Sequence, residues 1–543
     1  METHATTLSD TQSPSKKDSP MSKTDSVDIG EVALELGSAE HPSKSGETEL
    51  SAAIEQAVNH RRLSPRQIQL TAMAGSIGAA LFVGIGSGVM SGPLCLFLAF
   101  IFWASVVFSV AQCQTEIVTL LPLDGAFIRL AGRMADPALG VAVGWNHFFA
   151  QTSYVIFEAT VINTLVQYWD YINRLRFSFR ILLAAGLIIY TIVVMLGGNP
   201  MNDRFGFRYW KEPGLWAGAN PSSRLMSFVD AVNVAAFCMG GPEYISMIAG
   251  EARDPRRTVP RAFTTIMTRL IILYWWLSLR RSKSSRILVP YNDQTLTNGS
   301  DTYAGGSPYV ISMQGLNIPV LPSVVNAALI TTIVSAGNAY TFNASRSLHA
   351  LALDGRAPKF LRRLNKRGVP YMAVIVVMLL SCLAYLALGS SSAKVLNWIL
   401  NFCTAATMFN WTVISFTWIR FNAANKAQGI DKKSFLPSAS RFQPYAGYWA
   451  FFWAFSFLWL QGYAVFIKGN WEVSTFIFNY GIIALASVIG IGWKVLKRTP
   501  FHKSEDVDLI SGLEIFDALT EYYRHEREAA PVTVKDKIIV RIF

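Results

Sequence analysis

Long apolar stretches alternate with short polar segments along most of the chain. Between residues 71 and 496 these stretches are about 20 residues long, enough for a helix to cross the roughly 30 Å hydrocarbon core of a bilayer. They lack the apolar–polar alternation of a membrane-spanning β-strand. The pattern predicts an all-α polytopic membrane protein. Its eleven expected spans are residues 71–90, 94–120, 138–166, 178–197, 228–249, 263–279, 320–342, 371–389, 395–420, 446–467 and 474–496.

Both ends of the chain are polar. Residues 1–62 are rich in Ser, Thr, Lys, Asp and Glu and have no apolar core, so we expect a disordered cytoplasmic tail and not a cleaved signal peptide. Residues 63–499 then form the membrane domain, and residues 500–543 form a second cytoplasmic tail with a helix around Glu521. The lipid bilayer is therefore the first partner that the sequence implies.

Composition narrows the class further. The 543 residues are 51% hydrophobic and 15% charged, whereas about a quarter of the residues in soluble domains are charged. The net charge of +12 comes from short Lys and Arg clusters between apolar stretches, as the positive-inside rule produces, so no nucleic-acid partner is expected. The five cysteines show no disulfide-like or metal-ligand spacing, and the sequence contains no recognisable nucleophile–base pair. We therefore expect no cofactor, no metal and no enzymatic activity.

The basic clusters conflict with an odd number of crossings. Segment 250–262 carries four arginines and should face the cytoplasm, yet counting crossings from the first span places it outside. Either a segment within residues 146–230 fails to cross, or one helix is absent there. The span at 263–279 is short, because a basic cluster begins at Arg280. Asn298 lies in a glycosylation sequon beyond that cluster, which suits the outer face.

Two glycine-rich stretches interrupt spans that would otherwise be continuous helices. Residues 75–88 contain five glycines, each costing about 1 kcal/mol of helix stability relative to alanine. This stretch has two interpretations: close helix packing through small residues, or a broken helix whose free N–H groups bind a carboxylate. The stretch Phe237–Tyr244 then places two glycines, a proline and Glu243 in mid-span, which breaks the helical hydrogen-bond ladder. Such a pair of broken helices indicates a transporter site, and an α-amino acid fits it.

Five further motifs surround these spans, at Arg62–Ile68, Gly250–Arg257, Ser335–Ala339, Ser345–Ala352 and Arg367–Tyr371. With them the chain resembles the fungal amino acid permeases, within the amino acid–polyamine–organocation superfamily, from about residue 61 to residue 499. The resemblance implies a twelve-helix, leucine-transporter-like bundle of inverted repeats. It also implies uptake of amino acids together with protons at the plasma membrane, with both tails cytoplasmic if the fold is complete.

The resemblance assigns roles to individual positions. The first broken helix would bind the substrate carboxylate, and the second would bind its ammonium group and side chain. The residues expected at the substrate are Ser76, Ile77, Gly78, Glu158, Phe237, Gly240 and Glu243. Glu158, in the third helix, could instead be a structural hydrogen-bonding partner. Asn338 would line the site or bond across helices, and Trp411 is expected to pack in the core or at the membrane interface.

The chain departs from the family pattern in three places. Residues 178–198 resemble the fifth family helix but follow almost directly on Asp170, where the third one ends, so the fourth helix is expected to be missing. Arg180 stands where the wider superfamily has a lysine associated with ion or proton coupling. Arginine does not lose its proton, so Arg180 could act only as a fixed charge that mimics a bound cation. Pro242 replaces a threonine of many relatives.

Two functions follow from these observations. The first is a proton-coupled amino acid permease that works by alternating access. The second is a non-transporting relative, either an amino acid sensor or the inactive product of a shortened gene. The missing fourth helix and the shortened span at 263–279 support the second function, whereas the ordinary length of the tails argues against a sensor.

Overall fold

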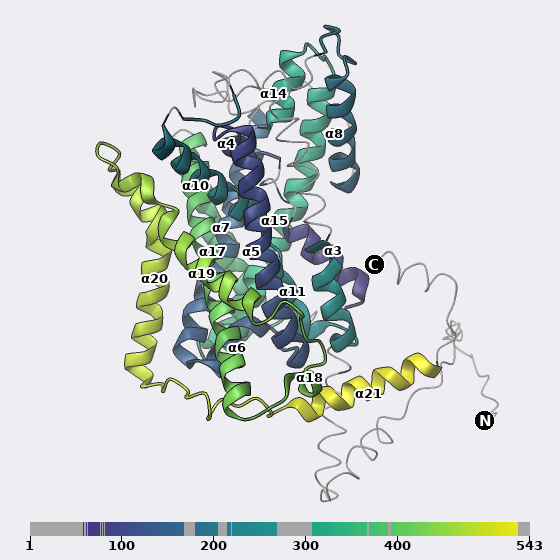
Figure 1. The fold of residues 1–543 in the computed structure, drawn as a ribbon, viewed down its shortest axis with the longest axis vertical. Coiled ribbons are helices and arrows are strands. Elements are labelled where there is room, and N and C mark those ends of the chain that lie inside the picture. Colours follow the sequence, from purple (N-terminus) through teal and green to yellow (C-terminus); the bar gives the residue numbers. More distant parts are fainter. Residues whose placement is uncertain are drawn as a thin grey trace, which may run out of the picture.

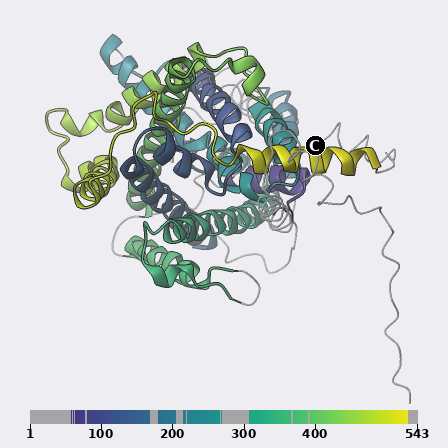
Figure 2. The same cartoon turned by 90° about the horizontal axis from the view of Figure 1, so that it is seen from below.

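The protein is a bundle of helices whose long members run along one common direction (Figures 1 and 2). The computed structural model describes residues 58, 61, 63–76, 78, 80, 82–167, 180–204, 214–218, 220–265, 267–268, 307–365, 369–388 and 392–529. Within this part of the chain no β-strand occurs, and a single isolated bridge joins Leu63 to Ala252. The predicted all-α class is therefore confirmed.

The α-helices follow the apolar stretches closely. They are α3 (Pro65–Ser76), α4 (Ile85–Val89), α5 (Pro93–Leu120), α6 (Ala126–Met134), α7 (Pro137–Gln167), α8 (Arg180–Met195), α10 (Pro221–Cys238), α11 (Pro242–Ile248), α14 (Pro308–Gly315), α15 (Leu321–Leu353), α16 (Tyr371–Ser381), α17 (Ser392–Ala427), α18 (Lys432–Phe435), α19 (Tyr445–Leu460), α20 (Val473–Lys497) and α21 (Leu513–Ala529). Short 3-10 segments follow α11, α15, α16 and α19, at Ala249–Glu251, Lys359–Arg362, Cys382–Leu388 and Tyr463–Phe466.

Several helices have the length and composition of membrane spans. Five segments within the described residues qualify: Pro93–Leu120, Pro221–Glu251, Leu321–Leu353, Lys394–Ala427 and Val473–Lys497. The chain is thus a multi-pass membrane protein, while the total of eleven spans stays a prediction. Most of the span expected at 263–279, the junction at 168–179, the sequon at Asn298 and nearly all of the tail at 1–62 lie outside the described residues.

Helix α7 lies at the centre of the bundle. It packs against α15, α17, α20 and α6, and small residues allow the close approach. A Cβ atom at Gly144 would lie 2.5 Å from Cδ2 of Leu351 in α15, so a larger residue at this crossing would force the Leu351 side chain to shift. α7 thereby holds Glu158 inside the bundle, where the side chain is only 2% exposed.

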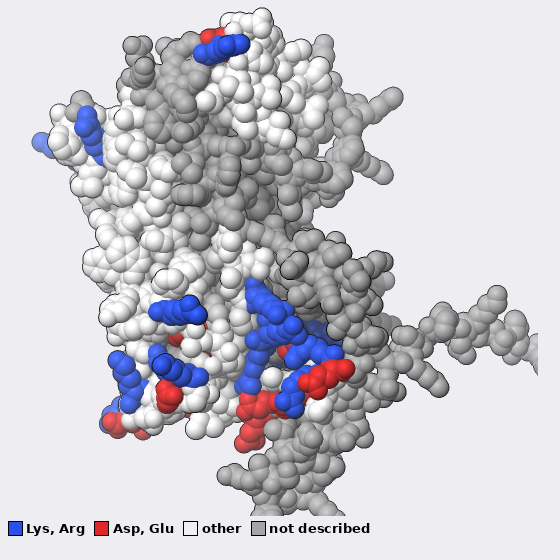
Figure 3. Space-filling model, turned by 45° about the vertical axis from the view of Figure 1, so that its right-hand side comes forward, with Lys and Arg blue, Asp and Glu red and all other residues white. Residues whose placement is uncertain are grey.

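Basic side chains gather at one end of the bundle (Figure 3). We call this the basic end and define it by Arg133, Arg253, Arg256, Lys494 and Arg527, which form ion pairs there. The middle of the bundle is free of visible charges on the face shown, whereas α8 and α14 lie at the opposite end (Figures 1 and 3). This distribution is typical of a membrane protein with one cytoplasmic face.

The chain turns back after α20 and crosses the basic end. Residues 499–529, here called the strap, run under α6 and finish in α21, which lies across the bundle (Figures 1 and 2). The helix expected around Glu521 is therefore present. Leu519 and Tyr523 of α21 are buried, so the strap packs on the membrane domain.

Asp136 joins the strap to the start of α7. Its carboxylate accepts the Ala138 N–H at 2.8 Å, as a helix cap does, and the Thr499 hydroxyl at 2.8 Å, and it pairs with Lys494. Burial raises the pKa of the Asp136 carboxyl, but the hydrogen bonds from Lys494, Ala138 and Thr499 lower it more, so this pKa lies below its usual value of 3.8.

We expect Asp136→Ala to destabilise the protein by about 1–2 kcal/mol, because the cap and the ion pair are both lost. Asp136→Asn keeps a capping oxygen and should cost less. Since the folded-state pKa is lowered, the benefit of the charge is complete above about pH 4 and is lost as the pH falls through the lowered pKa. Thermal unfolding of the detergent-solubilised variants between pH 7 and pH 3 measures both effects. Equal unfolding temperatures for wild type and Asp136→Ala at pH 7 would contradict the capping role.

Candidate functional site

Two helices are interrupted inside the bundle. The first ends as α3 at Ser76 and resumes as α4 at Ile85. The second ends as α10 at Cys238 and resumes as α11 at Pro242. Proline has no N–H and starts a helix more readily than it continues one, so the two glycines before Pro242 and the proline itself explain the second break.

The two breaks lie side by side. The Cys238 thiol donates to the carbonyl of Ala80 at 3.2 Å, which links the end of α10 to the first break. A Cβ at Gly75 would lie 3.1 Å from the Tyr244 ring of α11, and a Cβ at Gly84 would lie 3.1 Å from the Phe237 ring. The glycines therefore let the two broken helices approach until backbone meets aromatic rings.

Side chains of helices α7 and α15 lie against the first break. A Cβ at Gly78 would lie 2.3 Å from Glu158 Oε1 and 2.9 Å from Tyr340 Oη, so both side chains face this position. The Tyr340 hydroxyl donates to the carbonyl of Gly75 at 2.7 Å, which satisfies one peptide group that the broken helix leaves free. The first break thus has a buried carboxylate and a phenol beside the backbone of Gly78.

An aromatic layer lies along the same region. The Tyr154 ring stacks on Tyr340 with 4.9 Å between ring centroids and on Phe237 at 5.6 Å. Phe157 meets Phe237 edge-on at 4.9 Å. The sequence pattern indicated Phe237 as a site residue but not Tyr154 or Tyr340. Tyr154 lies four residues before Glu158, and Tyr340 lies four residues after Ala336. Residues four apart share a helix face, so this spacing could have indicated that both tyrosines face the site.

Glu243 lies in the first turn of α11, at the positive end of that half-helix. Its Oε2 accepts the indole N–H of Trp411 at 3.1 Å and the backbone N–H of Gly241 at 3.4 Å. Its Oε1 faces Gly240, where a Cβ would lie 3.3 Å away. One carboxylate oxygen is therefore anchored, and the other lies beside the backbone of the second break.

Trp411 does more than the packing expected of it. The side chain is fully buried in α17 and packs against Trp103, with 5.8 Å between ring centroids. Its indole N–H is directed at Glu243, as described above. Trp411 is therefore a positioning residue for Glu243, which no pattern in the sequence indicates.

The structure does not bring the side chains of the remaining candidates, as far as it describes them, to the two breaks. Ser76 ends α3 and Arg180 begins α8, but the side chains of both lie outside the described residues, as does Ile77 altogether. Asn338 lies on the exposed face of α15, opposite the Ala336 and Tyr340 face. Within the described residues, no cluster of three His, Cys, Asp or Glu side chains could hold a metal. The groups that lie at the two breaks are peptide groups at helix ends, the carboxylates of Glu158 and Glu243 and aromatic rings, which suit the binding of a small zwitterion.

We expect Gly78→Ala to destabilise the protein by about 1–3 kcal/mol, because the added methyl group must displace Glu158 and Tyr340. Gly186→Ala in α8 is the matched control, since a Cβ there has no neighbour within 4 Å and alanine favours the helix. Thermal unfolding in detergent compares the two variants. Equal unfolding temperatures would mean that the first break is not closely packed.

Comparison with known proteins agrees with this geometry. The family model described as amino acid permease matches residues 67–177 and 172–505 of the chain. The general amino acid permease AGP2 of Saccharomyces cerevisiae is 35% identical, covering 87% of this chain and 84% of the relative. The dicarboxylic amino acid permease of the same yeast is 33% identical, over 84% of this chain and 80% of the relative. A proline-specific permease of Emericella nidulans is also 33% identical, over 86% and 91%.

These matches confirm the predicted resemblance and the predicted class of activity, transport of amino acids across a membrane and not enzymatic catalysis. With 35% identity to a curated permease over most of both chains, and a family model that covers nearly the whole membrane domain, the chain belongs to the amino acid permease family.

Proposed function

We propose that the two breaks form one site that binds a zwitterionic α-amino acid, and that α3, α4, α10 and α11 expose this site alternately to the two sides of the membrane. The observation that carries the proposal is that the two helix breaks lie side by side, each with a buried carboxylate, Glu158 or Glu243, beside its backbone. A buried carboxylate inside a membrane bundle has a functional role by default, because its charge is expensive there.

Each part of the substrate has a complementary group. The carboxylate would bind backbone N–H groups around Ser76, Ile77 and Gly78, in the first break. The ammonium group would bind Oε1 of Glu243 and nearby carbonyls at Gly240. The side chain would lie against Phe237 and the aromatic layer, which favours a neutral side chain over a charged one.

We propose that protons drive the uptake. Glu158 and Glu243 are both nearly fully buried and are the carboxylates at the site, so either can carry a proton across the cycle. Arg180 and Asn338 are weaker coupling candidates, since arginine does not titrate and Asn338 lies on the exposed face of α15. The basic end would face the cytoplasm, with both tails, in the plasma membrane.

One observation favours the second function, a non-transporting relative. The family match comes in two segments that meet at residues 172–177, and α7 ends at Gln167 shortly before α8 begins at Arg180. This arrangement supports the absence of the fourth helix. A sensor or an inactive product would still bind an amino acid at the two breaks but would not move it across the membrane.

Uptake of labelled amino acids by cells that express the chain tests the proposal. We expect saturable uptake that falls when the proton gradient is dissipated, and loss of uptake in Glu243→Gln, which keeps an acceptor for Trp411 but removes the charge. A chain that reaches the cell surface and takes up none of the common amino acids supports the second function. Undiminished uptake by Glu243→Gln would contradict the role of this carboxylate.

We expect Trp411→Phe to raise the KM of uptake about tenfold with little change in maximal rate, because hydrogen bonds to charged groups contribute about 1.5–3 kcal/mol. Trp418→Phe is the matched control. Trp418 lies on the same helix and donates its indole N–H to a different buried carboxylate, Glu116, at 2.7 Å. That variant should lower the amount or stability of the protein but leave KM unchanged. Equal KM values for both variants would contradict the positioning role of Trp411.

A further inference from the structure

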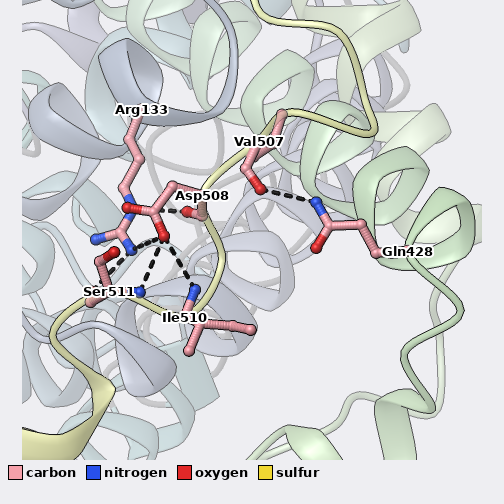
Figure 4. A network of polar contacts seen from close by, with 6 residues as sticks. All are labelled: Arg133, Gln428, Val507, Asp508, Ile510 and Ser511. Atoms are coloured by element: carbon pink, nitrogen blue, oxygen red, sulfur yellow. Dashed lines mark hydrogen bonds and ion pairs between the residues drawn. The ribbon is translucent and has the colours of Figure 1, made fainter.

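The first half of the strap is bound to helices that pack on α7. Arg133 of α6 donates to the carbonyls of Asp508 at 2.7 Å and Ser511 at 2.8 Å, and it pairs with the Asp508 carboxylate at 3.1 Å (Figure 4). Gln428, just after α17, donates to the carbonyl of Val507 at 2.7 Å (Figure 4). His502 donates its backbone N–H to the carbonyl of Ala135, before α7, at 2.9 Å. This half is therefore fixed to the centre of the bundle.

The second half of the strap, α21, is bound to the other side of the site. Its Asp517 pairs with Arg256, its Glu526 pairs with Arg253, and its Arg527 pairs with Asp254. All three partners follow directly on α11, the half-helix that carries Glu243. α21 therefore holds the outer end of the second broken helix.

The same helix also touches the chain before α3. The Arg61 guanidinium lies over the Phe516 ring, 5.5 Å from its centroid, and donates to the carbonyls of Pro122 at 3.0 Å and Ala249 at 3.3 Å. Arg61 precedes the start of α3 at Pro65 by four residues. Both half-helices that reach the basic end, α3 and α11, are thus connected to α21.

The seam between α21 and the bundle combines buried apolar side chains, such as Phe516, Leu519 and Tyr523, with a row of ion pairs. On the ion-pair side it borders an open pocket of about 610 Å³ lined by Arg256, Arg257, Asp517 and Leu513 among others, so the packing of α21 there is incomplete. Asp517 and Asp254 neutralise two of the arginines that line this pocket. The chain's own carboxylates therefore occupy part of the basic end. In each of these ion pairs at least one side chain is exposed, and partly exposed ion pairs are weak enough to open reversibly.

We propose that the strap is a latch that keeps the site closed towards the basic end. α3 and α11 are short and join the rest of the bundle through the breaks, so opening on this side requires their outer ends to move away from α7 and α17. The strap bridges these two groups and must release one of them first. This proposal rests on the proposed function, because the site that the latch closes is the one formed by the two breaks. The latch would regulate access to that site through residues that do not themselves bind the substrate.

Hydrogen–deuterium exchange of the purified full-length chain in lipid nanodiscs tests the latch. The variant Asp517→Arg, Glu526→Arg, Arg527→Glu reverses the three α21 charges that pair with the segment after α11. We expect exchange in residues 63–76 and 242–257 to become about three- to tenfold faster, because the closed state loses three exposed ion pairs. Exchange in α7 and α17 should stay unchanged, which shows that the bundle remains folded.

The matched control reverses three charges of the same kinds on α21 that make no ion pair with the bundle among the described residues: Glu514→Arg, Glu528→Arg, Arg524→Glu. It should leave exchange in α3 and α11 as in wild type. The latch is overturned if the test variant frees α21 without speeding exchange in α3 and α11, or if α21 stays docked, or if both variants behave alike. The readout needs no transport, so it stands apart from the uptake experiment.

Discussion

Every peptide group that a membrane helix leaves unpaired must find another partner, because lipid offers none. The breaks between α3 and α4 and between α10 and α11 create such groups inside the bundle. Tyr340 satisfies the carbonyl of Gly75, Cys238 that of Ala80, and Glu243 the N–H of Gly241. The helices around the breaks supply these partners, and in the proposed function a substrate with its own carboxylate and ammonium group would replace or extend them.

Helix α17 supplies hydrogen-bond donors to buried carboxylates. Trp411 and Trp418 each direct an indole N–H at a buried glutamate on a different helix, Glu243 and Glu116. A buried carboxylate without such a donor would be costly. The Trp–Glu pairs therefore stabilise the charge, and in the case of Glu243 they also decide which oxygen faces the site.

The basic end can serve two purposes, the orientation of the chain in the membrane and the binding of the strap. A cluster of Lys and Arg at one end is the pattern that the positive-inside rule describes, and Arg253 and Arg256 of this cluster pair with the acidic side chains of α21. One set of residues can thus orient the chain in the membrane and hold the strap in place. Exposed ion pairs suit this second task because each contributes little, so the contact can be made and undone.

Particular residues show which features the sequence alone can predict. Runs of about 20 apolar residues determine helices, and clusters such as Gly240, Gly241 and Pro242 determine where a helix breaks, because both effects depend on neighbouring residues alone. Tyr340 meets Gly75 across 265 positions, and Trp411 meets Glu243 across 168. Those contacts, and the docking of α21 on the segment after α11, follow only from how the helices pack. Hydropathy and helix propensity are local properties, whereas the partner of a buried polar group is decided by which helix lies next to it in space.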